Sequence, residues 1–187
     1  MTYGQYLSDP RKQSWPSLLA EKLNLDVKNL GYPGSSNKRI WWNIVNFKYK
    51  PTDLICVLWS HIDRWCIIKE NKPIIDLNQW RTNTDTVSSV YFEHIHDFHD
   101  LTVSFWLMAN HAKNFLDFKG LTNYQINASQ VGYDFDWNHI TFPDIEMEQL
   151  REKYPKANDG NHPGPLAHLE FANQMYDLIK VDSQPNE

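Results

Sequence analysis

The chain has 187 residues and a formal net charge of −5, a length that suits one domain, residues 1–187, around a single hydrophobic core. Lysine and arginine are dispersed without a basic run, which argues against binding to nucleic acid or to an anionic membrane. The longest apolar runs fall far short of the roughly 20 residues that cross a bilayer, and residues 1–25 lack the layout of a signal peptide. We therefore expect a cytoplasmic protein.

The amino-terminal part predicts a helix, a strand and a second helix. Residues 14–24 show apolar side chains at helical spacing, and Ser14 can act as their N-cap. The alternating residues 25–31 predict a short strand. A second helix should follow Ser35 or Ser36, because either side chain can cap it.

The middle of the chain predicts one buried strand and one long helix. Residues 53–60, DLICVLWS, are almost continuously apolar, which is typical of a strand buried on both faces of a parallel sheet. Residues 61–86 show no clear period and predict a long irregular excursion. A long helix should then run to Lys119 and Gly120. Its apolar face recurs at helical spacing and consists of Phe92, Ile95, Phe98, Leu101, Phe105, Met108, Ala112 and Phe115.

The carboxyl-terminal part predicts a strand at 123–129, an aromatic-rich loop at 131–147, a short helix at 145–153 and a last helix at 164–180. Strands that alternate with helices predict a three-layer α/β domain with a mainly parallel sheet. Ligands of such sheets usually bind at the carboxyl ends of the strands.

The cysteines and several histidines have structural interpretations. Cys56 lies in an apolar run and Cys66 lies beside a tryptophan, so we expect buried reduced thiols rather than a disulfide. The string EHIHDFHD, residues 93–100, permits a metal-site interpretation, but its polar residues fall off the apolar face and indicate a solvated helix surface. We also expect His111 and His168 on helix surfaces. No metal ion or other cofactor is predicted.

Polar residues follow the predicted strands in three segments, at 29–37, 57–65 and 158–164. In the last of these, an aspartate stands three residues before a histidine on a loop that contains glycine. Such an aspartate can accept the Nδ1 proton of the imidazole and hold Nε2 toward a nucleophile. Asp159 and His162 are therefore a candidate orienting residue and general base.

Three segments, SWPSLLAEKL, NLGYPGSSN and DGNHPGPLAHLEFA, resemble in this order the first helix, the Asn-x-Gly-x-x-Gly block and the Asp-x-x-His block of the SGNH or GDSL-type hydrolases. The strings SSNKRI and NHPGPLAH are similar to small, phage-type members. The resemblance extends over nearly the whole chain. It implies a flavodoxin-like SGNH-hydrolase fold and an esterase or acetylhydrolase that works through a Ser-His-Asp mechanism without a cofactor.

The resemblance assigns roles residue by residue. Asp159 and His162 match the last block, and Gly34 is similar to the backbone donor of the oxyanion hole. His61 falls where the family has a side-chain oxyanion donor, although WSHI replaces the family's Gly-x-Asn-Asp. Neighbouring residues are candidates for substrate binding, or alternatively for the core and the polar end of a strand: Trp59, Ser60 and Arg64.

The family's nucleophile block, Gly-Asp-Ser-Leu-Thr-x-Gly, has only its end in this sequence. MTYG matches Leu-Thr-x-Gly, so the serine would stand one residue before Met1, and the first strand of the sheet would be missing with it. Three explanations remain open: a misassigned start in a longer protein, a natural relative without catalysis, and a substitute nucleophile. The candidates for a substitute are Thr2, Ser35, Ser36 and Ser60.

Two functions follow from these alternatives. The first is an ester hydrolase for a small ester or an acylated carbohydrate, inactive in the chain as given because the serine is absent. The tryptophan-rich loops favour a carbohydrate, since sugars stack on aromatic rings. The alternative is a binding or structural module that keeps a vestigial hydrolase cleft.

Overall fold

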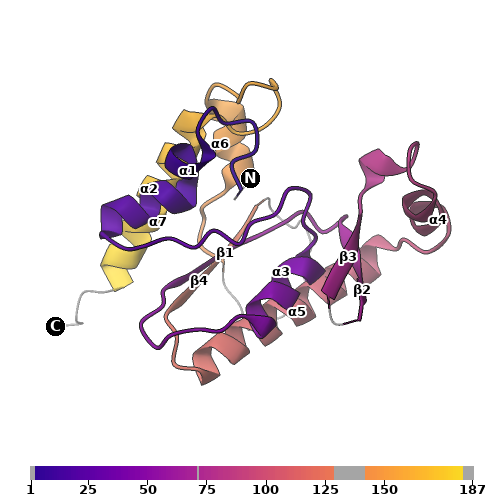
Figure 1. The fold of residues 1–187 in the computed structure, drawn as a ribbon, viewed down its shortest axis with the longest axis horizontal. Helices are drawn as coiled ribbons and strands as arrows, with labels where there is room; N and C mark the ends of the chain where they lie inside the picture. The colour runs from indigo at the N-terminus through magenta and orange to yellow at the C-terminus, as the bar shows by residue number, and fades with distance from the viewer. Residues whose placement is uncertain (1–2, 71, 129–141, 183–187) are drawn as a thin grey trace. The chain divides into compact units, whose positions relative to one another are not determined.

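A computed structural model describes residues 3–70, 72–128 and 142–182 (Figure 1). The described chain is mixed α/β, which confirms the predicted class at that level. The chain divides into two compact units. The first unit combines Met1–Pro33 with Asp144–Glu187, and the second unit is Gly34–Pro143.

The elements of the first unit are four helices. They are α1 (Pro10–Gln13), α2 (Trp15–Leu23), α6 (Met147–Lys153) and α7 (Pro165–Asp182). The second unit holds the strands and the remaining helices. They are α3 (Asn37–Asn46), β1 (Ile55–Trp59), β2 (Trp65–Lys69), β3 (Lys72–Leu77), the short 3₁₀ helix η1 (Gln79–Arg81), α4 (Thr86–His94), α5 (Phe98–Phe118) and β4 (Asn123–Asn127).

The first unit is built on the packing of α2 against α7. Its centre is the contact between Trp15 and Phe171, whose ring centroids lie 5.1 Å apart. Both rings are fully buried, as is Met175 one helical turn further along α7. Apolar side chains at a spacing of about four residues therefore form the buried face of α7, as a helix that packs on one side requires.

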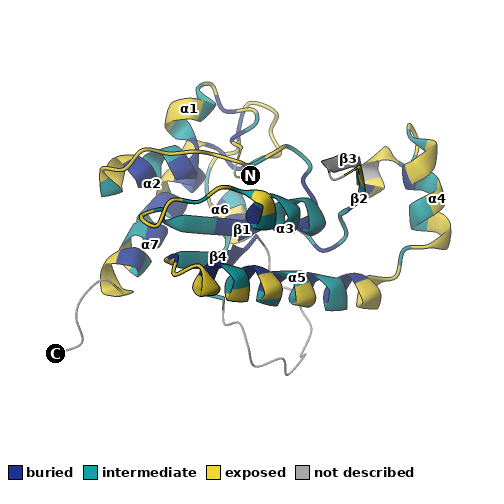
Figure 2. Ribbon diagram, turned by 60° about the horizontal axis from the view of Figure 1, so that its bottom comes forward, coloured by how far each residue is buried: buried dark blue, intermediate teal, exposed yellow. Residues whose placement is uncertain are grey.

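The second unit is built on a pair of parallel strands, β1 and β4, in which Val57 lies opposite Gln125. Helix α5 turns its buried residues inward and its exposed residues outward (Figure 2). The core contains Trp59 and Phe105, whose rings meet edge to face at a centroid distance of 5.8 Å, together with Ile44 of α3. The predicted buried strand at 53–60 is thus confirmed as β1.

Most other predicted elements are confirmed within one to three residues at their ends. The helices predicted at 14–24, 145–153 and 164–180 correspond to α2, α6 and α7, and Ser36 caps α3 by accepting the backbone N–H of Arg39. The predicted strand at 123–129 corresponds to β4. Residues 131–141 of the predicted aromatic loop lie outside the described residues.

The strand predicted at 25–31 is wrong. Residues 25–32 take no regular structure, and Leu25, Val27, Leu30 and Tyr32 are exposed. An alternating pattern forms a strand only where a neighbouring strand accepts its hydrogen bonds. No strand pairs with this segment within the residues that the structure describes.

The irregular excursion predicted at 61–86 is also wrong, because β2 and β3 form an antiparallel hairpin there. The apolar residues of β2 are adjacent in sequence rather than alternating, and a register shift between Ile67 and Ile68 interrupts the pairing. Such a bulge hides the two-residue period that identifies a strand. Glu70, in the connection, takes a left-handed backbone with φ 52°.

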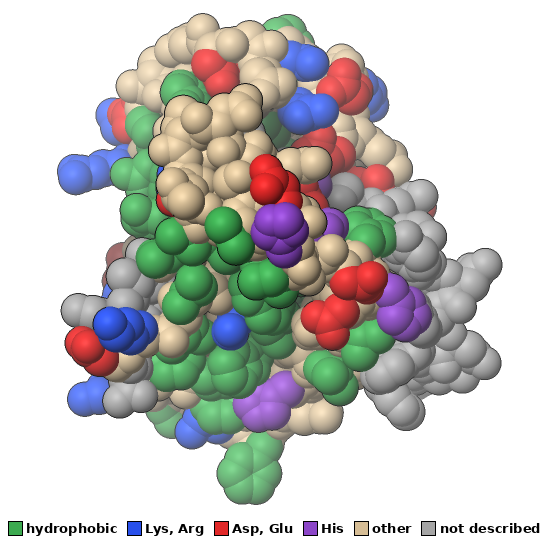
Figure 3. All heavy atoms as spheres, turned by 90° about the vertical axis from the view of Figure 1, so that its right-hand side faces the viewer, with side chains coloured by type: hydrophobic (Ala, Val, Ile, Leu, Met, Phe, Trp, Pro, Cys, Tyr) green, Lys and Arg blue, Asp and Glu red, His purple; other side chains and the backbone are tan. Residues whose placement is uncertain are grey.

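The single long helix expected to follow is divided in two. Asp97 caps α5 by accepting the backbone N–H of Asp100, and α5 therefore begins as a separate helix after the end of α4. Ile95, expected on a buried face, is 66% exposed as a result. Val87 and Val90 of α4 are exposed as well, and hydrophobic side chains gather on the face drawn in Figure 3. The predicted end at Lys119 and Gly120 is confirmed.

None of the described helices combines the length and the apolar character needed to cross a membrane.

Candidate functional site

The loop that carries Asp159 and His162 is a closed turn in the first unit. The N–H of Ala157 donates to the carbonyl of His162 at 2.8 Å, and the N–H of Gly160 donates back to the carbonyl of Ala157 at 2.8 Å. Gly160 has φ +70°, a left-handed conformation that glycine adopts without strain. The turn therefore brings the carboxylate and the imidazole onto the same side of the loop.

Asp159 accepts three hydrogen bonds. Its Oδ1 receives the backbone N–H of Asn161 at 3.2 Å and that of His162 at 3.1 Å, and its Oδ2 lies 2.5 Å from Nδ1 of His162. Burial acts to raise the pKa of the Asp159 carboxyl, but the hydrogen bonds from His162 and Asn161 outweigh it and lower the pKa from 3.8 to about 2. The side chain is therefore an ionised carboxylate at neutral pH.

The ionised carboxylate decides which ring nitrogen of His162 carries the proton. A carboxylate only accepts hydrogen bonds, so Nδ1 must donate to it, and Nε2 of the neutral ring is left as an acceptor. Nε2 has no hydrogen-bond partner within the described residues, and the side chain is 37% exposed. A general base requires such an arrangement, in which the ring is held in orientation through Nδ1 and Nε2 is able to accept a proton.

Tyr6 lies against His162 on the same unit. The two ring centroids are 4.8 Å apart with the planes tilted by 36°. The carbonyl of Tyr6 also accepts the backbone N–H of Asn158, at 3.4 Å. The amino-terminal turn is thus attached to the loop through both its backbone and its aromatic ring. Sequence reasoning did not single out Tyr6, because nothing local connects residue 6 to residue 162.

The helix that follows the loop begins under tight constraints. A Cβ atom on Gly164 would lie 2.1 Å from the carbonyl oxygen of Pro155, so only glycine fits there. The carbonyl of Gly164 accepts the N–H of His168 in the first turn of α7. The close approach of two backbone segments fixes the end of the loop that carries His162.

His168 is buried, so its expected place on a helix surface is wrong. It is 1% exposed, and its Nδ1 accepts the backbone N–H of Trp15 at 3.2 Å. Burial lowers the pKa of its imidazole from 6.5 to about 3, which keeps the ring neutral. The signal was present in the sequence, since His168 lies one turn before Phe171 and Ala172 on the apolar face of the last helix. His111 is exposed, as predicted.

The candidate oxyanion and substrate residues belong to the second unit, where Asn37 contacts two of them, Ser60 and His61. The N–H of Ser60 donates to Oδ1 of Asn37 at 2.7 Å, and Nδ2 of Asn37 donates to the carbonyl of Ser60 at 3.1 Å and to that of His61 at 3.5 Å. Arg64 Nη1 donates to Oγ of Ser60 at 2.9 Å. The side chain of Asn37 thus bonds both the N–H and the carbonyl of Ser60, the residue that follows β1, and so fixes the backbone at the carboxyl end of the strand.

Asn37 is a residue that sequence reasoning missed. It lies inside the GSSN segment quoted for the resemblance and is 2% exposed. A buried amide needs partners for its donors and its acceptor, and the sequence alone does not show where these lie. Gly34, the candidate oxyanion donor, has φ +74° and lies in the turn that precedes α3.

Trp59 supports the core alternative. It is fully buried, and its Nε1 donates to Oε1 of Gln125 at 3.0 Å. Two candidate substitutes for the nucleophile have engaged hydroxyls, since Ser36 caps α3 and Ser60 accepts Arg64. Ser35 is largely buried. The fourth candidate, Thr2, lies outside the described residues.

The two cysteines are free, as predicted. Cys66 is fully buried, and burial raises the pKa of the Cys56 thiol to about 12. Both thiols therefore stay protonated and unreactive at neutral pH. Within residues 3–70, 72–128 and 142–182, no cluster of three or more His, Cys, Asp or Glu side chains could hold a metal ion.

Comparison of the chain with protein-family models, with curated proteins and with solved structures finds no match.

Proposed function

We propose that Asp159 and His162 are the orienting residue and the general base of an SGNH-type ester hydrolase with a flavodoxin-like three-layer fold. The observation that carries the proposal is the hydrogen bond from Nδ1 of His162 to Asp159, with the imidazole side chain 37% exposed and Nε2 without a partner within the described residues. The substrate class is a small ester or an acylated carbohydrate, and the chemistry needs no cofactor.

The roles follow from acyl-transfer chemistry. Nε2 of His162 takes the proton of a serine hydroxyl as that oxygen attacks the ester carbonyl, and later returns the proton to the leaving alcohol. Asp159 stabilises the imidazolium formed in between. The resemblance assigns the donors of the oxyanion hole to the backbone N–H of Gly34 and the side chain of His61.

The serine is proposed to come from sequence outside residues 1–187, because MTYG matches only the end of the family's nucleophile block. The second candidate function, a binding or structural module with a vestigial cleft, applies if no such serine exists and none of the substitutes serves. The hydroxyls of Ser36 and Ser60 are already engaged in hydrogen bonds that stabilise the fold, so neither is prepared as a substitute nucleophile.

A comparison of two chains tests the proposal. One is residues 1–187, and the other is extended by the codons that precede Met1 in frame. We expect a fluorophosphonate probe to label only the extended chain, and p-nitrophenyl acetate to be hydrolysed by it. His162→Ala should abolish both signals, whereas His94→Ala, which changes an exposed histidine on α4, should leave both intact. An in-frame stop codon upstream, or an extended chain without labelling, would favour the binding module.

A further inference from the structure

We infer that Tyr6 is a positioning residue for His162: its ring holds the plane of the imidazole so that Nε2 keeps one direction. The inference rests on the proposed function, in which Nε2 is the atom that accepts the proton. It gives a role to Tyr6, which is far in sequence from the loop that carries Asp159 and His162.

The hydrogen bond to Asp159 leaves one degree of freedom open. It fixes the position of Nδ1, but the imidazole can still tilt about the axis that joins Nδ1 to the carboxylate. A tilt moves Nε2, and general-base catalysis is sensitive to such displacements. The ring of Tyr6 has its centroid 4.8 Å from that of the imidazole, at an interplanar angle of 36°, and a neighbour this close opposes the tilt. The carboxylate and the phenol ring together define where Nε2 points.

The backbone of Tyr6 is strained, and the surrounding turn maintains the strain. Tyr6 has φ 71°, a left-handed conformation that residues with a Cβ rarely take. The turn is closed by a hydrogen bond from the N–H of Leu7 to the carbonyl of Gly4, at 3.2 Å. Strain of this kind persists where the surrounding structure imposes it, and it concentrates at functional sites.

The neighbours of Tyr6 show how the turn is imposed. Gly4 has φ +72°, and a Cβ there would lie 2.9 Å from Leu7 Cδ1 and 3.0 Å from Ser14 Cβ. Leu7 and Ser14 are buried, so the turn cannot move away from them. Tyr6 itself is 43% exposed, so burial of its own ring does not explain why a tyrosine stands at a strained position. The contact with His162 does.

The left-handed backbone of Tyr6 makes it possible to remove the ring without disturbing the turn. Glycine suits φ 71°, so Tyr6→Gly removes the ring and keeps the turn. Tyr6→Phe keeps the ring and removes the hydroxyl. Tyr3→Ala is the matched control, because Tyr3 is an exposed tyrosine on the same segment.

The readout is the Nδ1 proton of His162 observed by NMR in the chain of residues 1–187, which needs no nucleophile. In the wild type, in Tyr6→Phe and in Tyr3→Ala we expect slow exchange of this proton with water. In Tyr6→Gly we expect exchange to be several-fold faster, while the amide of Asn158 stays protected because it donates to the backbone carbonyl of residue 6. Unchanged exchange of the Nδ1 proton in Tyr6→Gly would overturn the inference.

A second variant guards against a collapse of the turn. If the Asn158 amide loses protection in Tyr6→Gly, the same measurement is made on Tyr6→Asn, because asparagine also tolerates a left-handed backbone. Faster exchange of the Nδ1 proton with a protected Asn158 amide supports the inference, and wild-type exchange contradicts it.

Kinetics of the extended chain separate this inference from the proposed function. We expect Tyr6→Gly to lower kcat about tenfold with little change in KM, since a misdirected base affects the chemical step. An extended chain that depends on His162 but is indifferent to Tyr6→Gly would refute the role of Tyr6 alone. An inactive extended chain whose Nδ1 proton still responds to Tyr6 would refute the hydrolase proposal alone.

Discussion

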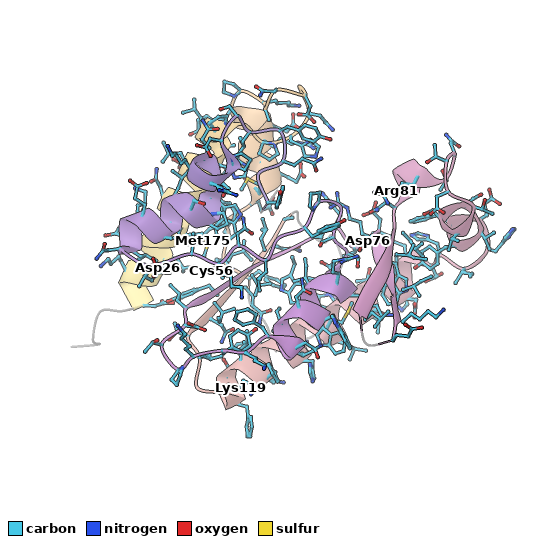
Figure 4. The ribbon with its side chains drawn as sticks, viewed as in Figure 1. Asp26, Cys56, Asp76, Arg81, Lys119 and Met175 are labelled. Carbon is cyan, nitrogen blue, oxygen red and sulfur yellow. The ribbon has the colours of Figure 1, made fainter. Side chains whose placement is uncertain are left out.

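Arg39 and Asp76 form a two-armed ion pair, with Nε 3.0 Å from Oδ1 and Nη2 2.6 Å from Oδ2, which joins the first turn of α3 to β3. Figure 4 marks Asp76 on that strand. The two side chains are only 16% and 7% exposed. Because a buried charge is costly without its partner, the pair holds the β2–β3 hairpin against α3 within the second unit.

Removing one partner of this pair should destabilise the second unit strongly. We expect Asp76→Asn to lower the free energy of unfolding by about 3 kcal/mol, because Arg39 would keep a buried charge. Replacing both, as in Arg39→Met with Asp76→Leu, should lower it by less. Urea unfolding measures both changes. Lys113→Ala, which breaks an exposed pair with Asp117, should cost less than about 1 kcal/mol, and an equal cost at both sites would contradict the argument.

The parts of the fold that sequence predicts are those with local signals. The helices α2, α3, α6 and α7 show apolar periodicity, α3 also has the capping residue Ser36, and β1 is a continuous apolar run. The hairpin escapes prediction because its bulge between Ile67 and Ile68 breaks the two-residue period. For the segment 25–31 the error is the reverse: its alternating pattern predicts a strand, but no strand pairs with it within the described residues.

In the candidate site too, sequence predicts the local contacts and misses the distant ones. Asp159 and His162 are three residues apart on one loop, and this spacing, together with the order of the three quoted segments, predicts the hydrogen bond that the structure contains. Tyr6 and Asn37 were missed because each acts on a residue that is distant in sequence and close in space. His168 was misplaced although the sequence shows it on the apolar face of the last helix, because the N–H of Trp15 that its buried ring accepts is distant in sequence.

The buried imidazole of His168 should make the protein sensitive to mild acid. Burial lowers the pKa of the folded imidazole to about 3 from 6.5. Below pH 6.5 the imidazole of His168 binds a proton in the unfolded chain, whereas in the folded chain it stays neutral until the pH falls to about 3. The contribution of this residue to stability is therefore complete above pH 6.5 and is lost progressively as the pH falls toward 3.

The matched variant is His168→Gln, whose amide oxygen can still accept the N–H of Trp15 but does not titrate. Between pH 7.5 and 5, we expect the free energy of unfolding to fall by about 2 kcal/mol more in the wild type than in the variant. Urea unfolding at both pH values measures the difference. Identical pH dependence in the two proteins would show that His168 is not held neutral.

The amide of Asn37 should be required for the end of β1. Asn37→Ala removes the acceptor for the N–H of Ser60 and the donor to its carbonyl. We expect a loss of about 1 to 3 kcal/mol, because buried backbone groups would lack partners, together with faster hydrogen exchange at the Ser60 amide. Asn46→Ala on the same helix is the control, since Asn46 makes an exposed bond to the carbonyl of Trp42. Slow exchange at Ser60 in Asn37→Ala would contradict the role.

Two glycines near the candidate base should differ sharply when changed to alanine. In Gly164→Ala the new Cβ would lie 2.1 Å from the carbonyl oxygen of Pro155, and backbone atoms cannot yield as a side chain can. We expect a loss of at least about 3 kcal/mol. Gly160→Ala meets open space and suffers only from its φ of +70°, which costs about 1 kcal/mol. Thermal unfolding ranks the two, and a reversed order would contradict the steric argument.

Replacing the carboxylate of Asp159, the proposed orienting residue, should switch the proton on His162 from one nitrogen to the other. In Asp159→Asn the backbone N–H groups of Asn161 and His162 would keep the amide oxygen at the position of Oδ1. The amide nitrogen must then face Nδ1 and donate to it, which moves the ring proton to Nε2. Nε2 would no longer accept a proton from a nucleophile.

The ¹⁵N chemical shifts of the imidazole report this exchange of tautomers directly in the chain of residues 1–187. We expect a protonated Nδ1 in the wild type and a protonated Nε2 in Asp159→Asn. In the extended chain, kcat should fall by about 10⁴, whereas the free energy of unfolding should change little, because the loop is on the surface. Asn161→Ala should keep the wild-type tautomer, since the Nδ1 contact does not involve it. A wild-type tautomer in Asp159→Asn would mean that the two backbone N–H groups do not hold the side chain in place, and the assignment of Asp159 as the orienting residue would have to be given up.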